Sequence, residues 1–204
     1  MDEQQKIDEI SVKILKYCGD AIVSSITSII NNSIASGIFP DELKKARVLP
    51  IFKSGNSEVT ANYRPISILP ILSKIIERHI ADQMQEYFKL TDIIYKYQSG
   101  FRKYHSCSTA LTILIDSWLK DIDNGNIIGT VYFDLVDHEI LLYKMKLYNF
   151  SENTRLFFKS YLTNRTQLVQ IGNTKSTIME IKSGVPQGSI LGPIFFIMYI
   201  NDMV

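Results

Sequence analysis

The stretch Ser183-Gly-Val-Pro-Gln-Gly-Ser-Ile-Leu-Gly-Pro193 decides how the second half of the chain is organised. Glycine and proline at this density are typical of a loop, because both residues interrupt regular helices and strands. The apolar run at residues 194–200 follows directly and predicts a helix. Glycines in such a loop also let the backbone approach a ligand closely. A loop that approaches a ligand is therefore one interpretation of this stretch, and a tight turn that only joins two elements is the alternative.

Upstream of this loop, predicted helices and strands alternate irregularly. Hydrophobic periodicity and turn residues predict helices in the first forty residues and over 70–88, 108–122, 138–147 and 154–162. The same signals predict strands over 46–52 and 127–135, and a hairpin of 167–171 and 177–181 around Gly172-Asn173. This irregular order favours an α+β fold over a regular doubly wound sheet.

Three of these elements carry more specific expectations. The proline within strand 46–52 predicts a position at the edge of a sheet. Strand 127–135 is rich in β-branched and aromatic residues and is expected to be buried. The helix over 108–122 is expected to turn one apolar face inward, made of Leu111, Leu114, Ile115, Trp118, Leu119 and Ile122.

Composition narrows the class of protein. The chain has 204 residues, 46% of them hydrophobic and 21% charged, which is typical of one globular domain rather than a disordered chain. No apolar run is long enough to span a bilayer and the polar start is no signal peptide, so an intracellular location without a membrane partner is expected. The two cysteines, Cys18 and Cys107, are expected to be free thiols.

Charge is spread unevenly along the chain. The net charge is +1, yet residues 43–106 contain eleven Lys and Arg against five Asp and Glu. Such a basic half suits a partner that carries phosphate. The alternative is that these Lys and Arg residues lie on a solvated surface, cluster by chance and bind no partner.

Three segments together resemble one family. They are Ala46-Arg-Val-Leu-Pro-Ile-Phe-Lys-Ser-Gly-Asn56 with Asn62-Tyr-Arg-Pro-Ile-Ser67 and Leu72-Ser-Lys-Ile-Ile-Glu-Arg78, then Gln98-Ser-Gly-Phe-Arg-Lys-Tyr-His-Ser-Cys-Ser-Thr-Ala110, then the loop that ends at Pro193. In this order they resemble the reverse transcriptase domain of non-LTR retrotransposons of the LINE-like, jockey type. The resemblance implies the fingers and a partial palm of a right-hand polymerase, with an incomplete palm sheet. It divides the chain into a helical lead-in over about 1–42, fingers over about 43–125 and a partial palm over about 126–204.

The resemblance also implies roles for individual residues. Lys53 and Arg64 are expected to reach the incoming triphosphate, since Lys offers a mobile charge and Arg a planar fork of donors. Other residues are expected to shape the pocket for template and nucleotide, namely Gln98, Phe101 and Arg102, with Gly184, Pro186, Gln187 and Gly188 of the loop. The implied partners are an RNA template, a DNA primer and deoxynucleoside triphosphates.

Members of this family hold two Mg²⁺ ions with carboxylates, one from a palm strand and two adjacent aspartates from a later hairpin. Asp134 resembles the first ligand, but this chain passes from Leu135 directly to Val136-Asp137-His138 and lacks a stretch that relatives contain. Asp137 is not expected to substitute for it. The motif Tyr199-Ile-Asn-Asp202 has one aspartate and does not match the paired signature.

Catalysis by this chain alone is therefore not expected. Two alternatives stand beside a working polymerase domain: a remnant that binds nucleic acid without catalysis, and a translated pseudogene without a selected function.

Overall fold

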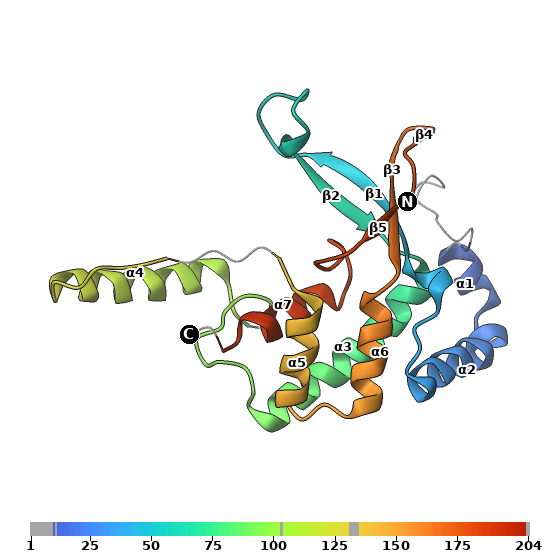
Figure 1. Cartoon of the computed structure of the whole chain (residues 1–204), viewed down its shortest axis with the longest axis horizontal. Helices are drawn as coiled ribbons and strands as arrows, with labels where there is room; N and C mark the ends of the chain where they lie inside the picture. Colours follow the sequence, from blue (N-terminus) through green and yellow to red (C-terminus); the bar gives the residue numbers. More distant parts are fainter. Residues whose placement is uncertain (1–9, 11, 103, 131–134, 203–204) are drawn as a thin grey trace.

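The computed structural model describes residues 10, 12–102, 104–130 and 135–202. A helical body carries a mixed sheet at one end, and one long helix projects from its side (Figure 1). The helices are α1 Val12–Cys18, α2 Asp20–Ser36, α3 Ile71–Thr91, α4 Cys107–Asp123, α5 His138–Leu147, α6 Glu152–Leu162 and α7 Gly192–Ile200. The strands are β1 Lys45–Phe52, β2 Tyr63–Ile68, β3 Arg165–Ile171, β4 Thr174–Lys175 and β5 Met179–Ile181. The expected mixture of helices with an irregular sheet is confirmed.

The sheet is built around β1 and β3. β1 pairs antiparallel with β2 and parallel with β3, while β3 pairs antiparallel with both β4 and β5. The edge position predicted for residues 46–52 is therefore wrong, because β1 has a neighbour on each side. Pro50 is tolerated because it faces Pro65 and lies beyond Val48, where the pairing with β3 ends. Two prolines can face each other where the ladder needs no N–H donor.

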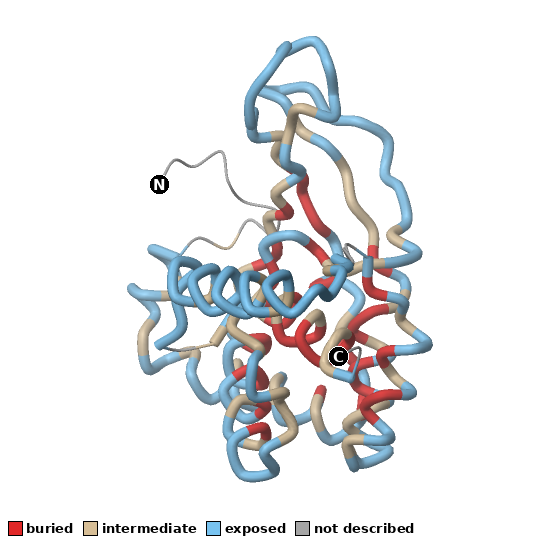
Figure 2. Tube along the Cα trace, turned by 90° about the vertical axis from the view of Figure 1, so that its left-hand side faces the viewer, coloured by how far each residue is buried: buried red, intermediate tan, exposed pale blue. Residues whose placement is uncertain are grey.

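The hydrophobic core lies in the helical body, where α3, α5, α6 and α7 meet. Leu141, Phe158 and Phe195 have almost no exposed surface, and Figure 2 shows the buried trace concentrated there. The rings of Phe158 and Phe195 pack edge to face with centroids 5.2 Å apart. The helices over α3, α5, α6 and α7 confirm the predicted ones within a few residues. Among the described residues, no helix is both long and apolar enough to cross a membrane.

Helix α4 forms as predicted, but its apolar face is not inward. The helix has no buried residue, and Leu111, Ile115 and Leu119 are 55%, 42% and 54% exposed. Figure 1 shows α4 extending away from the body, so no neighbouring element covers this face in the described chain. Hydrophobic periodicity reports that a helix has an apolar side, and it does not report what covers that side.

The buried strand predicted over 127–135 is also not found in the part of it that the structure describes. Residues 127–130 and Leu135 are not in a strand, and Ile127 and Leu135 are 98% and 61% exposed. A strand needs a neighbour to satisfy its N–H and C=O groups, and none of the described strands pairs with these residues. Residues 131–134 lie outside the described residues.

The exposure of α4 gives a direct test. Leu119→Ala is expected to lower the free energy of unfolding by less than about 1 kcal/mol, because an exposed leucine leaves no cavity. Leu141→Ala, at a position with 0% exposure, is expected to cost about 2–5 kcal/mol. Urea unfolding of both variants measures the difference. A loss of several kcal/mol in Leu119→Ala would mean that α4 is packed in solution.

Candidate functional site

The loop of residues 183–191, called the glycine loop below, is fixed to the base of β2. The backbone N–H of Ser67 donates to the carbonyl of Gln187 over 2.7 Å. Gly188 has a φ of +118°, and a Cβ added there would lie 2.6 Å from the carbonyl oxygen of Ser67. At Gly188 the backbone of the loop therefore lies close to β2 of the same chain, while its approach to a ligand stays a prediction.

A buried carboxylate holds the other end of the loop. Glu77 of α3 is fully buried and accepts a hydrogen bond from the backbone N–H of Ile190 over 2.6 Å. Its other oxygen accepts from the hydroxyls of Ser73 and Tyr161, each over 3.0 Å. Burial, and then the charge of Glu77, raises the pKa of Tyr161 far above its ordinary range, so the phenol stays a donor. The loop is thus anchored to the core by a fully paired acid.

The start of the glycine loop contacts the segment that precedes α5. The N–H of Gly184 donates to the carbonyl of Val136 over 2.9 Å, and the ring of His138 lies 2.7 Å from the carbonyl of Gly184. A Cβ on Gly184 would meet the side chain of Leu135 at 3.5 Å. Asp134, the predicted metal ligand, lies outside the described residues. The segment that follows it in sequence is therefore joined to the glycine loop.

Lys53 and Arg64 lie on one face of the hairpin formed by β1 and β2. Arg64 pairs with Ile51 across the hairpin, and Lys53 follows Ile51 by two residues, which returns its side chain to the same face. The backbone N–H of Lys53 donates to the carbonyl of Asn62 over 2.8 Å and continues the ladder. Both cations are exposed, and neither is in an ion pair among the described residues.

The connection between β1 and β2 is ordered by its own side chains. Asn62 donates its amide to the carbonyl of Asn56 over 2.7 Å, and the side chain of Asn56 accepts from the N–H of Glu58 over 2.9 Å. The hydroxyl of Tyr63 donates to the carbonyl of Ser57 over 2.8 Å. These bonds order the connection between the two strands, so its backbone needs little further ordering when a ligand binds.

The other predicted pocket residues lie elsewhere, in the loop of residues 92–106. Arg102 donates from Nη1 to the carbonyls of Gln98, Lys96 and Tyr95 at 3.1, 3.4 and 3.5 Å, so this nitrogen holds its own loop together. Phe101 has a φ of +58° and is 67% exposed. Figure 1 draws this loop beside the C-terminal ends of α3 and α7, away from the β1–β2 hairpin.

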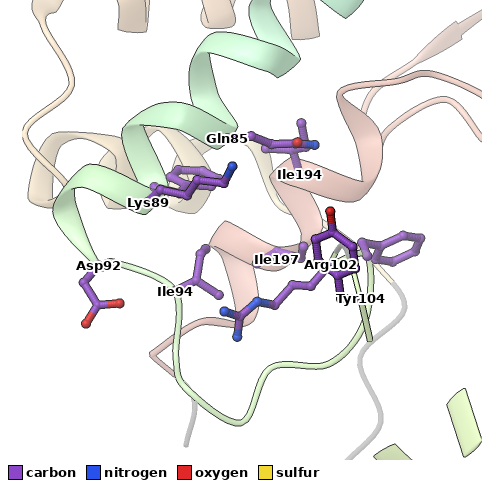
Figure 3. Close-up of a pocket in the computed structure, with 10 residues that line it drawn as sticks. Gln85, Lys89, Asp92, Ile94, Arg102, Tyr104, Ile194 and Ile197 are labelled. Atoms are coloured by element: carbon purple, nitrogen blue, oxygen red, sulfur yellow. The ribbon is translucent and has the colours of Figure 1, made fainter. Parts of the chain in front are cut away.

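A cavity of about 360 Å³ lies under this second loop. Figure 3 shows Lys89 and Asp92 of the α3 end, Arg102 and Tyr104 of the loop, and Ile197 of α7 around it. The walls are largely apolar, with a mixture of both charges at the rim. The structure therefore brings Lys53, Arg64 and the glycine loop near β2, and it leaves Gln98, Phe101 and Arg102 in a separate cluster.

Within the glycine loop itself the predicted residues differ in exposure. Pro186 is buried and its carbonyl accepts from the N–H of Ser189 over 3.0 Å, which closes a turn. Gln187 and Gly188 are exposed, and the side chain of Gln187 points to no partner among the described residues. Gln187 and Gly188 thus form the accessible surface of the turn.

Two structural residues escaped the sequence analysis. Glu77 is one of three acids on α3 and was not singled out, although it occurs four residues after Ser73 on the side that the apolar positions mark as inward. Asn201 holds the start of the 92–106 loop. Its amide nitrogen donates to the carbonyl of Ile93 over 2.8 Å, and its side-chain oxygen accepts from the N–H of Tyr95 over 2.7 Å. Polar residues on an apolar helix face are the available signal for such anchors.

Asp137 and Asp202, the two aspartates that the sequence analysis weighed beside Asp134, have other partners. Asp137 caps α5 by accepting from the N–H of Ile140 over 3.0 Å. Asp202 pairs with the ammonium of Lys144. No group of three or more His, Cys, Asp or Glu that could hold a metal ion occurs among the described residues. The part of the chain that the structure describes therefore does not fit two Mg²⁺ ions.

Comparison with known proteins agrees with the resemblance in the three motifs. Residues 44–204 match the family model described as reverse transcriptase (RNA-dependent DNA polymerase). The chain is 33% identical over 203 residues to the RNA-directed DNA polymerase from mobile element jockey of Drosophila melanogaster, an alignment of 96% of this chain.

Two further fruit-fly relatives are similarly close. The probable RNA-directed DNA polymerases from transposon BS and transposon X-element of Drosophila melanogaster are each 32% identical over 97% and 96% of this chain. The chain spans 22% of the length of these relatives, about a fifth. On these matches the chain belongs to the reverse transcriptase (RNA-dependent DNA polymerase) family, and it is homologous to the RNA-directed DNA polymerases of non-LTR retrotransposons.

Proposed function

We propose that this chain forms the nucleotide- and template-binding part of an RNA-directed DNA polymerase. The observation that carries the proposal is the strand register that sets Lys53 and Arg64 on one face of the β1–β2 hairpin. In this proposal the hairpin belongs to the fingers, within about 43–125, and α5 to α7 with the glycine loop belong to the partial palm, within about 126–204. The substrates are deoxynucleoside triphosphates on an RNA template with a DNA primer.

The two cations of the hairpin suit a triphosphate for electrostatic reasons. A triphosphate spreads several negative charges over a few ångströms. Lys supplies a mobile point charge that attracts them, and Arg supplies a planar fork of N–H donors that binds the oxygens. Neither side chain is neutralised by an acid in the described chain, so their field is available to a ligand. Because the connection between the strands is ordered by its own hydrogen bonds, little order has to be created on binding.

The glycine loop supports the same proposal by its attachment. Ser67 of β2 holds Gln187, and Val136 holds Gly184, so the loop joins the hairpin to the segment that follows Asp134. The exposed turn at Gln187 and Gly188 then faces outward beside the base of the hairpin as a surface for the nucleotide and the template. Gly184 and Pro186 shape that turn from within.

Reverse transcriptases normally use divalent metal ions, which assist the attack of the primer hydroxyl and the departure of pyrophosphate. In this chain Asp134 is the candidate ligand for Mg²⁺. Since the described residues do not form a metal site, no step through the ion is assigned to them. Gln98, Phe101 and Arg102 remain proposed template contacts, and reaching the nucleotide would require the 92–106 loop to move toward the hairpin.

The experiment is a measurement of nucleotide affinity by equilibrium dialysis in the presence of an RNA–DNA template–primer. Lys53→Gln and Arg64→Gln are each expected to weaken deoxynucleotide binding about tenfold, the loss of one charge-assisted contact. Lys159→Gln removes an exposed charge from α6 and is the matched control, with no change expected. Equal affinity in all four proteins would remove the basis of the proposal. If template–primer binding persists while no nucleotide binds, the chain acts as a nucleic-acid-binding remnant.

A further inference from the structure

One face of the sheet carries more positive charge than the hairpin pair. In the parallel register of β1 with β3, Lys45 faces Thr166 and Arg47 faces Leu168, so these four side chains share one face. Lys175 of β4 faces Gln170, which lies two residues beyond Leu168 and therefore joins the same face. The register thus gathers Lys45, Arg47 and Lys175 from three segments that are far apart in sequence.

Arg47 is the unusual member of this group because it is buried without a counterion among the residues that the structure describes. It is 6% exposed, and Nη1 donates to the side-chain oxygen of Gln170 over a long 3.3 Å. Nε and Nη2 are out of contact with solvent and have no hydrogen-bond partner in the described part of the chain. Burial lowers the pKa of Arg47. A buried donor without a partner costs free energy, and an anionic ligand would recover it.

A cavity of about 210 Å³ opens at this group. Its lining includes Lys45, Arg47, Gln170 and Lys175, together with the hydroxyl-bearing Thr166. Among the described strand residues, one acid shares the face: Glu180 of β5, which faces Thr166 across the sheet. It forms no ion pair with Arg47 or Lys45 among the described residues. Three cations against one carboxylate leave the cavity positive, and its volume is larger than a phosphate group needs.

We propose that this cavity is a second anion site, in which Arg47, Lys45 and Lys175 bind one phosphate group of a polynucleotide backbone. Arg47 contributes a planar fork that matches the oxygens of a phosphate, and the two lysines contribute mobile charges. Gln170 forms the outer contact of the guanidinium, and its amide rotates aside as the phosphate takes its place. The phosphate chemistry follows from these side chains, whereas the polynucleotide as its source rests on the proposed function.

The site is separate from the nucleotide-binding pair. Six residues of extended strand separate Arg47 from Lys53, which corresponds to roughly 20 Å. A single triphosphate is too short to contact Arg47 and Lys53 at the same time. The same sheet face therefore offers one contact to a nucleotide at the hairpin and another, farther along β1, to the backbone of a bound strand.

The test compares the whole chain with Arg47→Gln, Lys175→Gln and the control Lys159→Gln. Affinity for a short single-stranded RNA is measured by fluorescence anisotropy from about 50 to 200 mM salt, and affinity for inorganic phosphate by calorimetry. Each site variant is expected to weaken RNA binding about tenfold and to lower the salt slope by about 0.7, the value for one phosphate contact on a single strand. The control is expected to match the wild-type chain.

The outcomes separate the possible explanations. Loss of both RNA and phosphate affinity supports the site with a polynucleotide as its source. Loss of phosphate affinity alone keeps the anion site and overturns the polynucleotide as its source. Unchanged affinities and salt slope in folded variants overturn the proposal. Lys175 is exposed, so its variant remains informative even where Arg47→Gln fails to fold. None of these results depends on the nucleotide affinity of Lys53→Gln.

Discussion

Replacing Glu77 with leucine is expected to lower the free energy of unfolding by about 3–5 kcal/mol, because three donors lose their acceptor and a buried donor left without one costs about 1–3 kcal/mol. The carboxylate accepts hydrogen bonds from Ser73, Tyr161 and the N–H of Ile190. Leucine accepts none of them, so two buried hydroxyls and the part-buried N–H of Ile190 lose their partner at once. The glycine loop then loses its anchor on α3, and binding at the adjacent hairpin is expected to weaken as well.

Two companion variants make this test specific. Glu77→Gln keeps the shape and one acceptor oxygen but turns a donor toward the N–H of Ile190, so a smaller loss of about 2 kcal/mol is expected. Glu86→Leu changes an exposed acid on the same helix and is expected to stay within about 0.5 kcal/mol of the wild-type chain. Urea unfolding followed by circular dichroism measures all three. A Glu77→Leu chain as stable as Glu86→Leu would show that the carboxylate does not hold the loop.

Gly188→Ala is the second large effect, with an expected loss of about 3 kcal/mol or more from backbone strain and overlap combined. The residue has a φ of +118°, which an alanine rarely adopts. The new Cβ would also lie 2.6 Å from the carbonyl oxygen of Ser67, and the backbone of β2 has no flexible end that could move aside. The hydrogen bond between Ser67 and Gln187 is expected to break as the loop shifts away.

Gly125→Ala is the control that separates the backbone strain of a positive φ from the steric overlap expected in Gly188→Ala. Gly125 also has a positive φ, +77°, but a Cβ there meets no atom within 4 Å. It is expected to cost about 1 kcal/mol, the strain alone. Thermal and urea unfolding of the two variants give the comparison. If Gly188→Ala costs no more than Gly125→Ala, the loop does not lie against β2 in solution.

The helices of the body could be predicted from the sequence because their signals are local. Asp137 and Ser151 cap α5 and α6 through side-chain bonds to backbone N–H groups. The helix predicted over 138–147 matches α5, and the helix predicted over 154–162 matches α6 except that α6 begins two residues earlier. Gly172 and Asn173 likewise specify the turn between β3 and β4, where Ile171 faces Thr174. Such signals act within a few residues and do not depend on the rest of the fold.

The failures concern what each element packs against. Pro50 lacks an N–H and indicates an edge strand only where that N–H would otherwise be paired. Here it faces Pro65 of β2 in a pair without N–H donors and lies beyond Val48, where the pairing with β3 ends. The apolar residues of α4 predict a helix with one buried side, but burial depends on a partner element that periodicity does not identify. The same applies to residues 127–130, whose strand-like composition has no described neighbour to pair with.

The candidate site shows the same division. Lys53 and Arg64 could be named from the motifs, and the strand register adds that they share a face. Glu77 and Arg47 could not be singled out, because a buried charge and an exposed one have the same letter in a sequence. Their importance comes from long-range contacts, with Ile190 and Gln170 respectively.

The central claim is that the β1–β2 hairpin and the glycine loop together bind nucleotide on a template. Amide hydrogen exchange of the chain with template–primer, measured with and without a deoxynucleoside triphosphate, tests it most directly. The account predicts slower exchange on nucleotide addition at Lys53, at Ser67 and across residues 184–190, with α4 unchanged. Slowing confined to the 92–106 loop and α4, with no change in the hairpin or the glycine loop, would contradict the account.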